Sequence, residues 1–212
     1  MGARTACPPL TTMTEPTKYR GWHSRGYLPH FDQPGLVQSI TYRLHDALPL
    51  PVVEAMQQDH HWQDNIEKRQ QLEKYLDVGY GNCFLRDEQI ATLIEDNWKY
   101  FDGQRYRLIA WVVMPNHVHV LIEVFEGHLL DKIVQSWKSY TALKANKRLK
   151  LTGRFWYPDY FDRYVRDEKH FGNLVRYIHS NPVKAGLVES AELWPFSSIS
   201  LWQEERGQLV RT

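Results

Sequence analysis

The stretch WVVMPNHVHVLIEV, residues 111–124, combines an apolar run, a Pro-Asn break and a second run that alternates with a period of two. On a strand this period places alternate side chains on opposite faces. One series is Val118, Val120, Ile122 and Val124, and the other is His117, His119, Leu121 and Glu123. The pattern predicts two antiparallel strands, about 106–114 and 117–124, joined by a turn near Met114 to Asn116, with the valines in a core.

The two imidazoles of this strand form a candidate metal pair. Residues two apart on a strand lie about 6 to 7 Å apart, so the side chains of His117 and His119 can converge on one ion. A His-x-His sequence also occurs on strands without any metal. The metal hypothesis therefore requires a third ligand and a reactive group from another part of the chain.

The bulk composition predicts a soluble globular protein. With 212 residues, 42% hydrophobic and 24% charged, the chain suits one ordinary domain or at most two small ones. Its 26 Lys and Arg against 25 Asp and Glu do not by themselves indicate a nucleic-acid partner, so any such surface has to be local.

Cellular location follows from what the sequence lacks. Its two cysteines favour a reducing compartment over a disulfide framework. Residues 1–16 have no apolar core typical of a secretory signal, and no run approaches the roughly 20 residues of a membrane span. We expect a cytoplasmic protein without membrane association.

The first half of the chain is read as an irregular lead-in, a strand and two helical stretches. The lead-in covers residues 18–35 and the strand residues 36–44, which are rich in β-branched side chains. A charged helical stretch over 52–76 is expected to be an exposed arm or insertion. Asp87 is expected to cap a helix over 88–100.

A second long helix is predicted over 129–149, with Ile133, Trp137, Tyr140 and Leu143 facing inward. Between residues 132 and 154 the chain carries seven basic residues and no acid. They are Lys132, Lys138, Lys144, Lys147, Arg148, Lys150 and Arg154. The aromatic residues 155–157 follow, so this region offers cations for phosphates and rings for unstacked bases. A solvated helix leading into a packed aromatic loop explains the same composition equally well.

The last predicted helix spans residues 168–180, with Asp167 as its N-cap and an apolar stripe of Phe171, Leu174, Val175 and Ile178. Asn173, Tyr177 and Asn181 stand four apart beside that stripe. Pro182 disfavours helical backbone at Asn181, so the helix is predicted to end there.

These residue types fit covalent cleavage of a nucleic acid, which needs a nucleophile and a cation that withdraws charge from the scissile phosphate. Tyr177 can supply the first, and His117, His119 and the oxygen of Asn181 can hold the second. Taken singly, a helical tyrosine is more commonly a packing residue, and an asparagine before proline is more commonly a helix stop.

Two motifs in this order resemble a known family. MPNHVHVL, residues 114–121, is similar to the histidine-hydrophobic-histidine motif of single-tyrosine HUH transposases of the insertion-sequence type. RYIHSNPVKAGLV, residues 176–188, resembles the nucleophile helix of their REP-associated tyrosine transposase branch. Weaker likenesses are SITYRL at 39–44, GRFWYPDYFDRYVRD at 153–167 and WPFSS at 194–198. The resemblance covers about residues 20–200.

The resemblance implies a fold and a site. The fold is α+β: a ferredoxin-like or RRM-like antiparallel sheet with helices packed on one face and the histidines on the other, known as the HUH endonuclease fold. It forms one catalytic domain over 20–200, between a flexible tail at 1–19 and a C-terminal tail at 201–212. His117, His119 and Asn181 would bind Mg²⁺ or Mn²⁺, and Tyr177 would be the nucleophile.

The resemblance also implies an activity in DNA transposition and recombination. The enzyme would cleave single-stranded DNA at REP-like palindromic hairpins, keep the 5′ end as a phosphotyrosine, and rejoin strands. A monomer with its tyrosine in cis is favoured, with a homodimer as the alternative. The expected DNA contacts are Lys138, Lys144, Arg154, Trp156, Arg163, Arg166 and Lys184.

Three other functions remain open from the sequence. The first is a catalytically quiet, sequence-specific DNA-binding regulator on the same fold. The second is a metal-dependent phosphoesterase that activates water, with Tyr177 as a bystander. The third is an RRM-like RNA-binding module, which would carry aromatic side chains where the histidine strand has imidazoles and Glu123.

Overall fold

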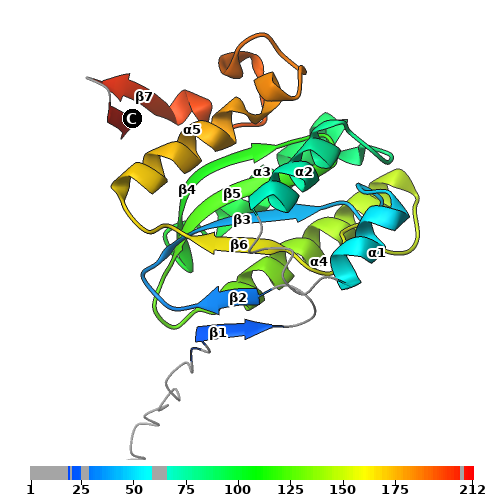
Figure 1. Cartoon of the computed structure of the whole chain (residues 1–212), viewed down its shortest axis with the longest axis horizontal. Helices are drawn as coiled ribbons and strands as arrows, with labels where there is room; N and C mark the ends of the chain where they lie inside the picture. Colours follow the sequence, from blue (N-terminus) through cyan, green and yellow to red (C-terminus); the bar gives the residue numbers. More distant parts are fainter. Residues whose placement is uncertain (1–18, 20, 25–28, 59–65, 206–207) are drawn as a thin grey trace, which may run out of the picture.

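A four-stranded antiparallel sheet forms the centre of the computed structural model, which describes residues 19, 21–24, 29–58, 66–205 and 208–212 (Figure 1). Its strand order is β4-β5-β3-β6. The strands are β3 (Val37–Arg43), β4 (Tyr106–Val113), β5 (His117–Val124) and β6 (Phe161–Tyr164). In the turn between β4 and β5 the Met114 amide donates to the His117 carbonyl at 2.9 Å, which confirms the predicted hairpin.

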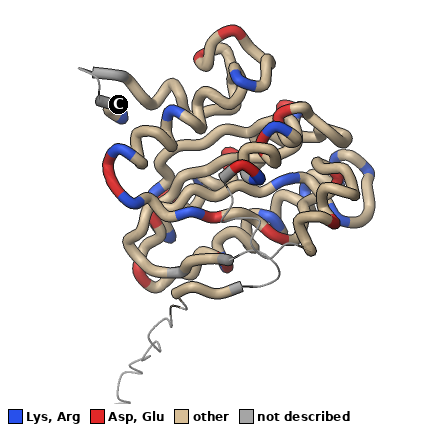
Figure 2. Tube along the Cα trace, viewed as in Figure 1, with Lys and Arg blue, Asp and Glu red and all other residues tan. Residues whose placement is uncertain are grey.

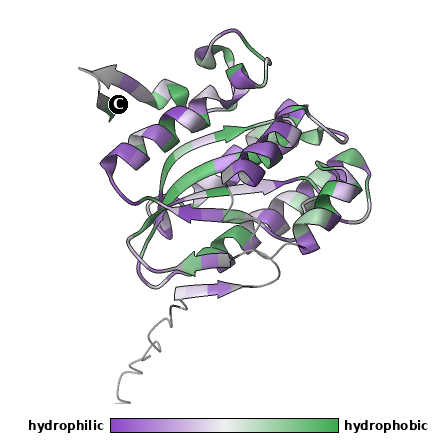
Figure 3. Ribbon diagram, viewed as in Figure 1, coloured by the Kyte–Doolittle hydropathy of each residue, from purple (hydrophilic) through white to green (hydrophobic). Residues whose placement is uncertain are grey.

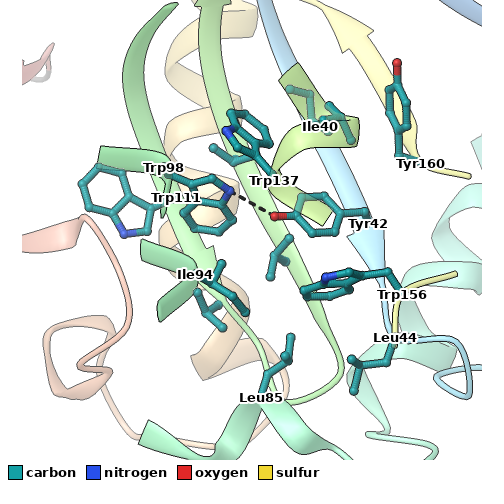
Figure 4. Close-up of a cluster of buried hydrophobic side chains, with 14 of the residues drawn as sticks. Ile40, Tyr42, Leu44, Leu85, Ile94, Trp98, Trp111, Trp137, Trp156 and Tyr160 are labelled. Carbon is teal, nitrogen blue, oxygen red and sulfur yellow. Dashed lines mark hydrogen bonds between the residues drawn. The ribbon is translucent and has the colours of Figure 1, made fainter. Parts of the chain in front are cut away.

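Helices α3 (Glu88–Tyr100) and α4 (Leu130–Leu149) cover one face of the sheet. Charged residues lie mostly on helices and loops (Figure 2), whereas β4 and β5 are largely apolar (Figure 3). The main core contains Trp98, Trp137 and Tyr42 (Figure 4), and the Trp98 indole donates to the Tyr42 hydroxyl at 3.0 Å. Asp87 caps α3 by accepting from the amides of residues 89 and 90, as predicted.

The orientation predicted for α4 is only partly right. Trp137 is fully buried, but Tyr140 is 46% and Leu143 69% exposed. Thr141 and Ala145 are buried instead. The buried stripe follows steps of three and four residues from Leu130, so apolar residues that lie off this line face solvent.

Helix α5 (Glu168–Lys184) packs on the other face of the sheet, where the histidines lie. A second apolar cluster joins Val175 and Ile178 of α5 to Leu121 of β5 and to β4. The α+β class and the antiparallel sheet are therefore as expected, and the structure adds helical cover on the histidine face.

Helix α5 continues past its predicted end at Asn181 and includes Pro182. A proline within a helix loses one hydrogen bond to the carbonyl four residues earlier, here that of Ile178. The Asn181 side-chain amide lies 3.5 Å from this carbonyl and 2.9 Å from that of Tyr177. Since Pro182 lies in the last turn, only this one bond is lost and the helix is not broken.

The predicted exposed arm is a pair of packed helices, α1 (Leu50–Gln58) and α2 (Ile66–Asp77). Met56, Leu72 and Leu76 are almost completely buried in the main core, so these helices pack on the domain and the expectation of an exposed arm is wrong. In α2 the buried residues form a narrow apolar stripe with a spacing of four, and the surrounding charged residues made this stripe hard to recognise in the sequence.

Two further segments differ from the prediction. The irregular lead-in contains a hairpin of β1 (Gly21–Ser24) and β2 (Pro29–Asp32). The C-terminal tail contains β7 (Trp202–Glu205) and β8 (Gln208–Arg211), and the Trp202 indole donates to the Ile109 carbonyl. Strands of four residues are too short for a clear alternation. The tail expected over 1–19 lies outside the described residues, apart from Tyr19.

Three short 3-10 turns complete the fold, η1 (Phe84–Arg86), η2 (Ala191–Leu193) and η3 (Ile199–Leu201). Among the described helices none has the length and apolar character required to cross a membrane.

Candidate active site

The two histidines of β5 point at each other. Their Nε2 atoms are 3.1 Å apart, and His117 and His119 are 1% and 3% exposed. The Nδ1 atom of His117 lies 2.8 Å from Oδ1 of Asn116, while the Asn116 amide donates to the Tyr80 carbonyl. A carbonyl oxygen only accepts, so the His117 proton lies on Nδ1 and its Nε2 carries a lone pair.

His119 has a similar partner on the neighbouring strand. Its Nδ1 atom is 2.8 Å from the hydroxyl of Thr41, its partner in the β3–β5 ladder. Burial lowers the pKa of His117 well below its ordinary value, and the neighbouring His119 lowers it further. Burial, followed by the charge of Lys184, lowers the pKa of His119 to about 3. Both imidazoles are therefore neutral at pH 7, which is the form that binds metal ions.

Helix α5 places Tyr177 against this pair. The rings of His119 and Tyr177 meet edge to face with 5.4 Å between centroids. Asn181 follows one turn later and is 1% exposed; its side-chain amide donates to the Tyr177 carbonyl, whereas its Oδ1 is buried and has no hydrogen-bond partner. The residues expected from the sequence thus lie on one strand and on the helix that packs beside it.

The donor set fits a divalent cation. No three His, Cys, Asp or Glu side chains of the described residues form a metal-binding group, and an amide oxygen is another kind of ligand that a divalent cation accepts. The unpartnered Asn181 oxygen is such a group, since a buried polar atom without a partner is costly unless a ligand satisfies it. Imidazole nitrogens combined with an amide oxygen suit Mn²⁺ at least as well as Mg²⁺.

A cavity of about 490 Å³ opens beside Tyr177 and His119. Helix α2 lines it with Gln70 and Glu73, and the sheet lines it through β3 and β6. The Tyr177 hydroxyl hydrogen-bonds to Glu73. Burial first, and then the charges of Glu73 and Asp77, raise the pKa of Tyr177 above its ordinary value.

Sequence reasoning missed Glu73. The only signal was a pair of carboxylates, Glu73 and Asp77, one turn apart in a charged helix. Nothing local indicated that α2 folds back over the sheet. Lys184 also belongs to the site, since its ammonium lies 4.5 Å from the centre of the Tyr177 ring.

Aromatic and basic side chains surround the cavity where it passes the edge strand β6. Trp22 is 64% exposed, and its ring lies 4.9 Å from that of Phe31 and 6.2 Å from that of Tyr164. Arg163 and Arg166 line the same cavity, and Figure 2 shows basic positions on β6 and at the start of α5. Two of the expected DNA contacts therefore line the cavity beside Tyr177, and a third, Lys184, lies over the Tyr177 ring.

The structure contradicts two other expected DNA contacts. Trp156 is 5% exposed, and its indole donates to the Thr141 hydroxyl at 2.9 Å, so it is a core residue. The Lys138 ammonium donates to the carbonyls of Tyr157 and Pro158 at 2.6 and 2.7 Å, so it anchors the aromatic loop. Burial lowers the pKa of Lys138 to about 8. The packed-loop alternative was the right one for both.

Lys144 and Arg154 are exposed, but they lie on α4 and just after it. Helix α4 packs against the valine face of β5, away from the histidines. The basic stretch of residues 132–154 is therefore not part of the cavity that contains Tyr177 and His119.

An antiparallel sheet that presents two adjacent histidines to a tyrosine on a packed helix is the arrangement expected of an HUH transposase. Residues 83–181 match the family model described as "Transposase IS200 like". This segment includes both histidines, Tyr177 and Asn181. This part of the chain is therefore similar to the IS200-like transposases.

Two curated proteins are similar to part of the chain. The REP-associated tyrosine transposase of Escherichia coli (strain K12) is 32% identical over 97 residues, which are 44% of this chain and 54% of that protein. A curated protein of Haemophilus influenzae is 26% identical over 103 residues, 44% of this chain and 58% of its own length. The match thus spans little more than half the length of these curated relatives.

A solved structure shares the fold. It is that of a REP-associated tyrosine transposase bound to a REP hairpin, with a TM-score of 0.51, 19% identity and coverage of 81% of each chain.

Proposed function

We propose that this protein is a metal-dependent endonuclease and strand transferase for single-stranded DNA, acting at REP-like hairpins through a covalent tyrosine intermediate. One observation carries the proposal: Tyr177 lies against His119 at the wall of a cavity, with Asn181 one turn along the same helix. The names of the relatives support the DNA substrate.

His117 and His119, through their Nε2 atoms, and Asn181, through Oδ1, would hold Mg²⁺ or Mn²⁺. A bound divalent cation withdraws charge from a phosphate and makes its phosphorus more electrophilic. The two imidazole rings are already oriented for metal binding, because Asn116 and Thr41 contact their Nδ1 atoms and leave the Nε2 atoms for the ion.

The reaction has two balanced halves. The Tyr177 hydroxyl loses its proton and its oxygen bonds to phosphorus, the bond from phosphorus to the 3′ oxygen breaks, and that oxygen takes up a proton and leaves as a 3′-OH. The 5′ phosphate remains on Tyr177. A second 3′-OH can then attack the phosphotyrosine and release the phenol, which rejoins strands without a nucleotide cofactor because the bond energy is conserved.

The surroundings of the cavity suit a single strand. Arg163, Arg166 and Lys184 supply positive charge for phosphates, and the exposed ring of Trp22 supplies a face on which a base can stack. The histidines and the tyrosine of the same chain lie against each other, which favours a monomer that acts in cis.

The test uses labelled single-stranded DNA with an imperfect palindromic repeat, incubated with Mg²⁺ or Mn²⁺ and run on a denaturing gel. We expect label that migrates with the protein, and none with Tyr177→Phe or His117→Ala. Cleavage that survives in Tyr177→Phe would instead indicate hydrolysis by water.

The second candidate is a catalytically quiet DNA-binding regulator. It is favoured by the hydrogen bond of Tyr177 to Glu73 and by the raised pKa of its hydroxyl, both of which oppose ionisation of the nucleophile. Hairpin binding without any covalent adduct in either metal would select this alternative.

A further inference from the structure

Helix α2 lies outside the segment that matches the family model, residues 83–181, and yet it reaches the nucleophile. Leu72 and Leu76 are 4% and 2% exposed and hold the helix in the core. Glu73, between them, is half-buried and lines the same cavity as Tyr177 and His119. Its carboxylate accepts a hydrogen bond from the Tyr177 hydroxyl. Packing of the two leucines therefore fixes the helix that carries this carboxylate.

We propose that Glu73 is a further catalytic residue, which orients the Tyr177 hydroxyl and accepts its proton while the phenol oxygen attacks phosphorus. The inference rests on the proposed function. It gives a catalytic role to a residue of helix α2, which lies outside the segment that matches the family model.

The chemistry requires a proton acceptor at this atom. A phenol is mostly protonated at neutral pH. The proton therefore has to leave as the new bond forms, to a base within hydrogen-bond reach of the hydroxyl. Glu73 meets this geometric requirement in the present conformation.

The step balances with groups that are present. The O–H bond of Tyr177 breaks toward the Glu73 carboxylate, the bond from oxygen to phosphorus forms, and the departing 3′ oxygen takes a proton from water. Glu73 then releases its proton to solvent. In the rejoining direction, protonated Glu73 returns a proton to the phenol oxygen as the phosphotyrosine bond breaks.

Two charged groups lie close to this contact. Among the described residues Glu73 does not form a group of three potential metal-binding side chains with the two histidines. Asp77 lies one turn further along α2, and Lys184 lies over the face of the Tyr177 ring.

The experiment compares adduct formation in single-turnover conditions by the full chain, Glu73→Gln and Gln71→Ala. Gln71 lies on the same helix, is exposed and is not among the residues that line the cavity, so it is the matched control. We expect Glu73→Gln to slow adduct formation about 100-fold, the usual size of a general-base effect. Gln71→Ala should stay within about threefold, and binding of the labelled strand should change little in either variant.

A second measurement separates proton transfer from positioning. A fluorinated tyrosine of lower phenol pKa is introduced at position 177 in both backgrounds. We expect it to recover most of the rate lost in Glu73→Gln and to change the protein with native Glu73 much less, because a more acidic phenol depends less on a base.

Two results would overturn the proposal: an unchanged rate in Glu73→Gln, or a deficit that the more acidic phenol does not reduce. If the unsubstituted protein forms no adduct at all, the proposed function fails first and this proposal fails with it.

Discussion

Asn116 connects the candidate metal pair to the rest of the protein. It is fully buried, its Oδ1 accepts from the His117 ring, and its amide donates to the Tyr80 carbonyl. Removing the groups that orient a ligating histidine typically lowers metal affinity 10- to 100-fold. We therefore expect Asn116→Ala to weaken Mn²⁺ binding by about that factor in calorimetry.

Thr41→Val tests the corresponding contact of His119, and a smaller loss is expected because a hydroxyl is a weaker partner than an amide. Unchanged Mn²⁺ affinity in a folded Asn116→Ala variant would contradict His117 as a ligand.

His30 joins strand β2 to the loop and strand beside it. It is 1% exposed and contacts Asp159 at 3.1 Å and also Asp162. Burial alone would lower its pKa, but the hydrogen bonds and charges of the two aspartates outweigh burial and raise the pKa to about 9. The folded protein therefore favours the protonated ring.

This shift predicts a pH dependence of stability. The pKa of His30 in the folded protein is higher than the unfolded value of 6.5. The stabilisation that protonated His30 contributes is therefore complete below about pH 6.5 and is lost as the pH rises through about 9. We expect the free energy of unfolding, measured with urea, to fall by up to roughly 3 kcal/mol over this window. His30→Gln should flatten the curve, and an equally steep fall in that variant would assign it to another group.

Strand β6 and the residues just before α5 carry basic residues that line the cavity beside Tyr177. Arg166 lines the cavity, whereas Arg154 follows α4 on the other side of the sheet. A phosphate contact contributes about one unit to the slope of log affinity against log salt. We expect Arg166→Ala to reduce this slope by about one for a labelled single strand and Arg154→Ala to leave it unchanged. Equal effects of the two variants would contradict the proposal that the DNA strand runs along β6.

Helices whose apolar residues form a regular stripe were predictable, and those without one were not. The stripe of α5 and the cap of α3 follow rules that act within one or two turns. Tyr140 and Leu143 of α4 are apolar but lie off the buried line, and their exposure depends on which neighbour the helix meets. In α2 the charges outnumber the buried leucines, so composition favoured exposure although Leu72 and Leu76 are core residues.

Within one copy of the chain, the tyrosine helix α5 packs against the histidine strand β5. Tyr177 contacts His119 within one copy, so mixing Tyr177→Phe with His117→Ala should restore no covalent adduct. Two inactive copies that exchanged their α5 helices would rebuild one intact site and recover activity. Recovery in the mixture, measured on the denaturing gel, would therefore show a swapped dimer in place of a monomer.

Local patterns in the sequence were sufficient to predict the β4–β5 hairpin, the opposite facing of valines and histidines, helices α3 and α5, and the residues proposed for the site. These follow from backbone periodicity, capping and side-chain spacing, which act over a few residues. Only the tertiary structure placed Tyr177 against His119, folded α2 over the site to bring Glu73 to the hydroxyl, and buried Trp156 and Lys138. Such contacts join segments far apart in the chain, and their energies depend on packing and burial that no short stretch of sequence specifies.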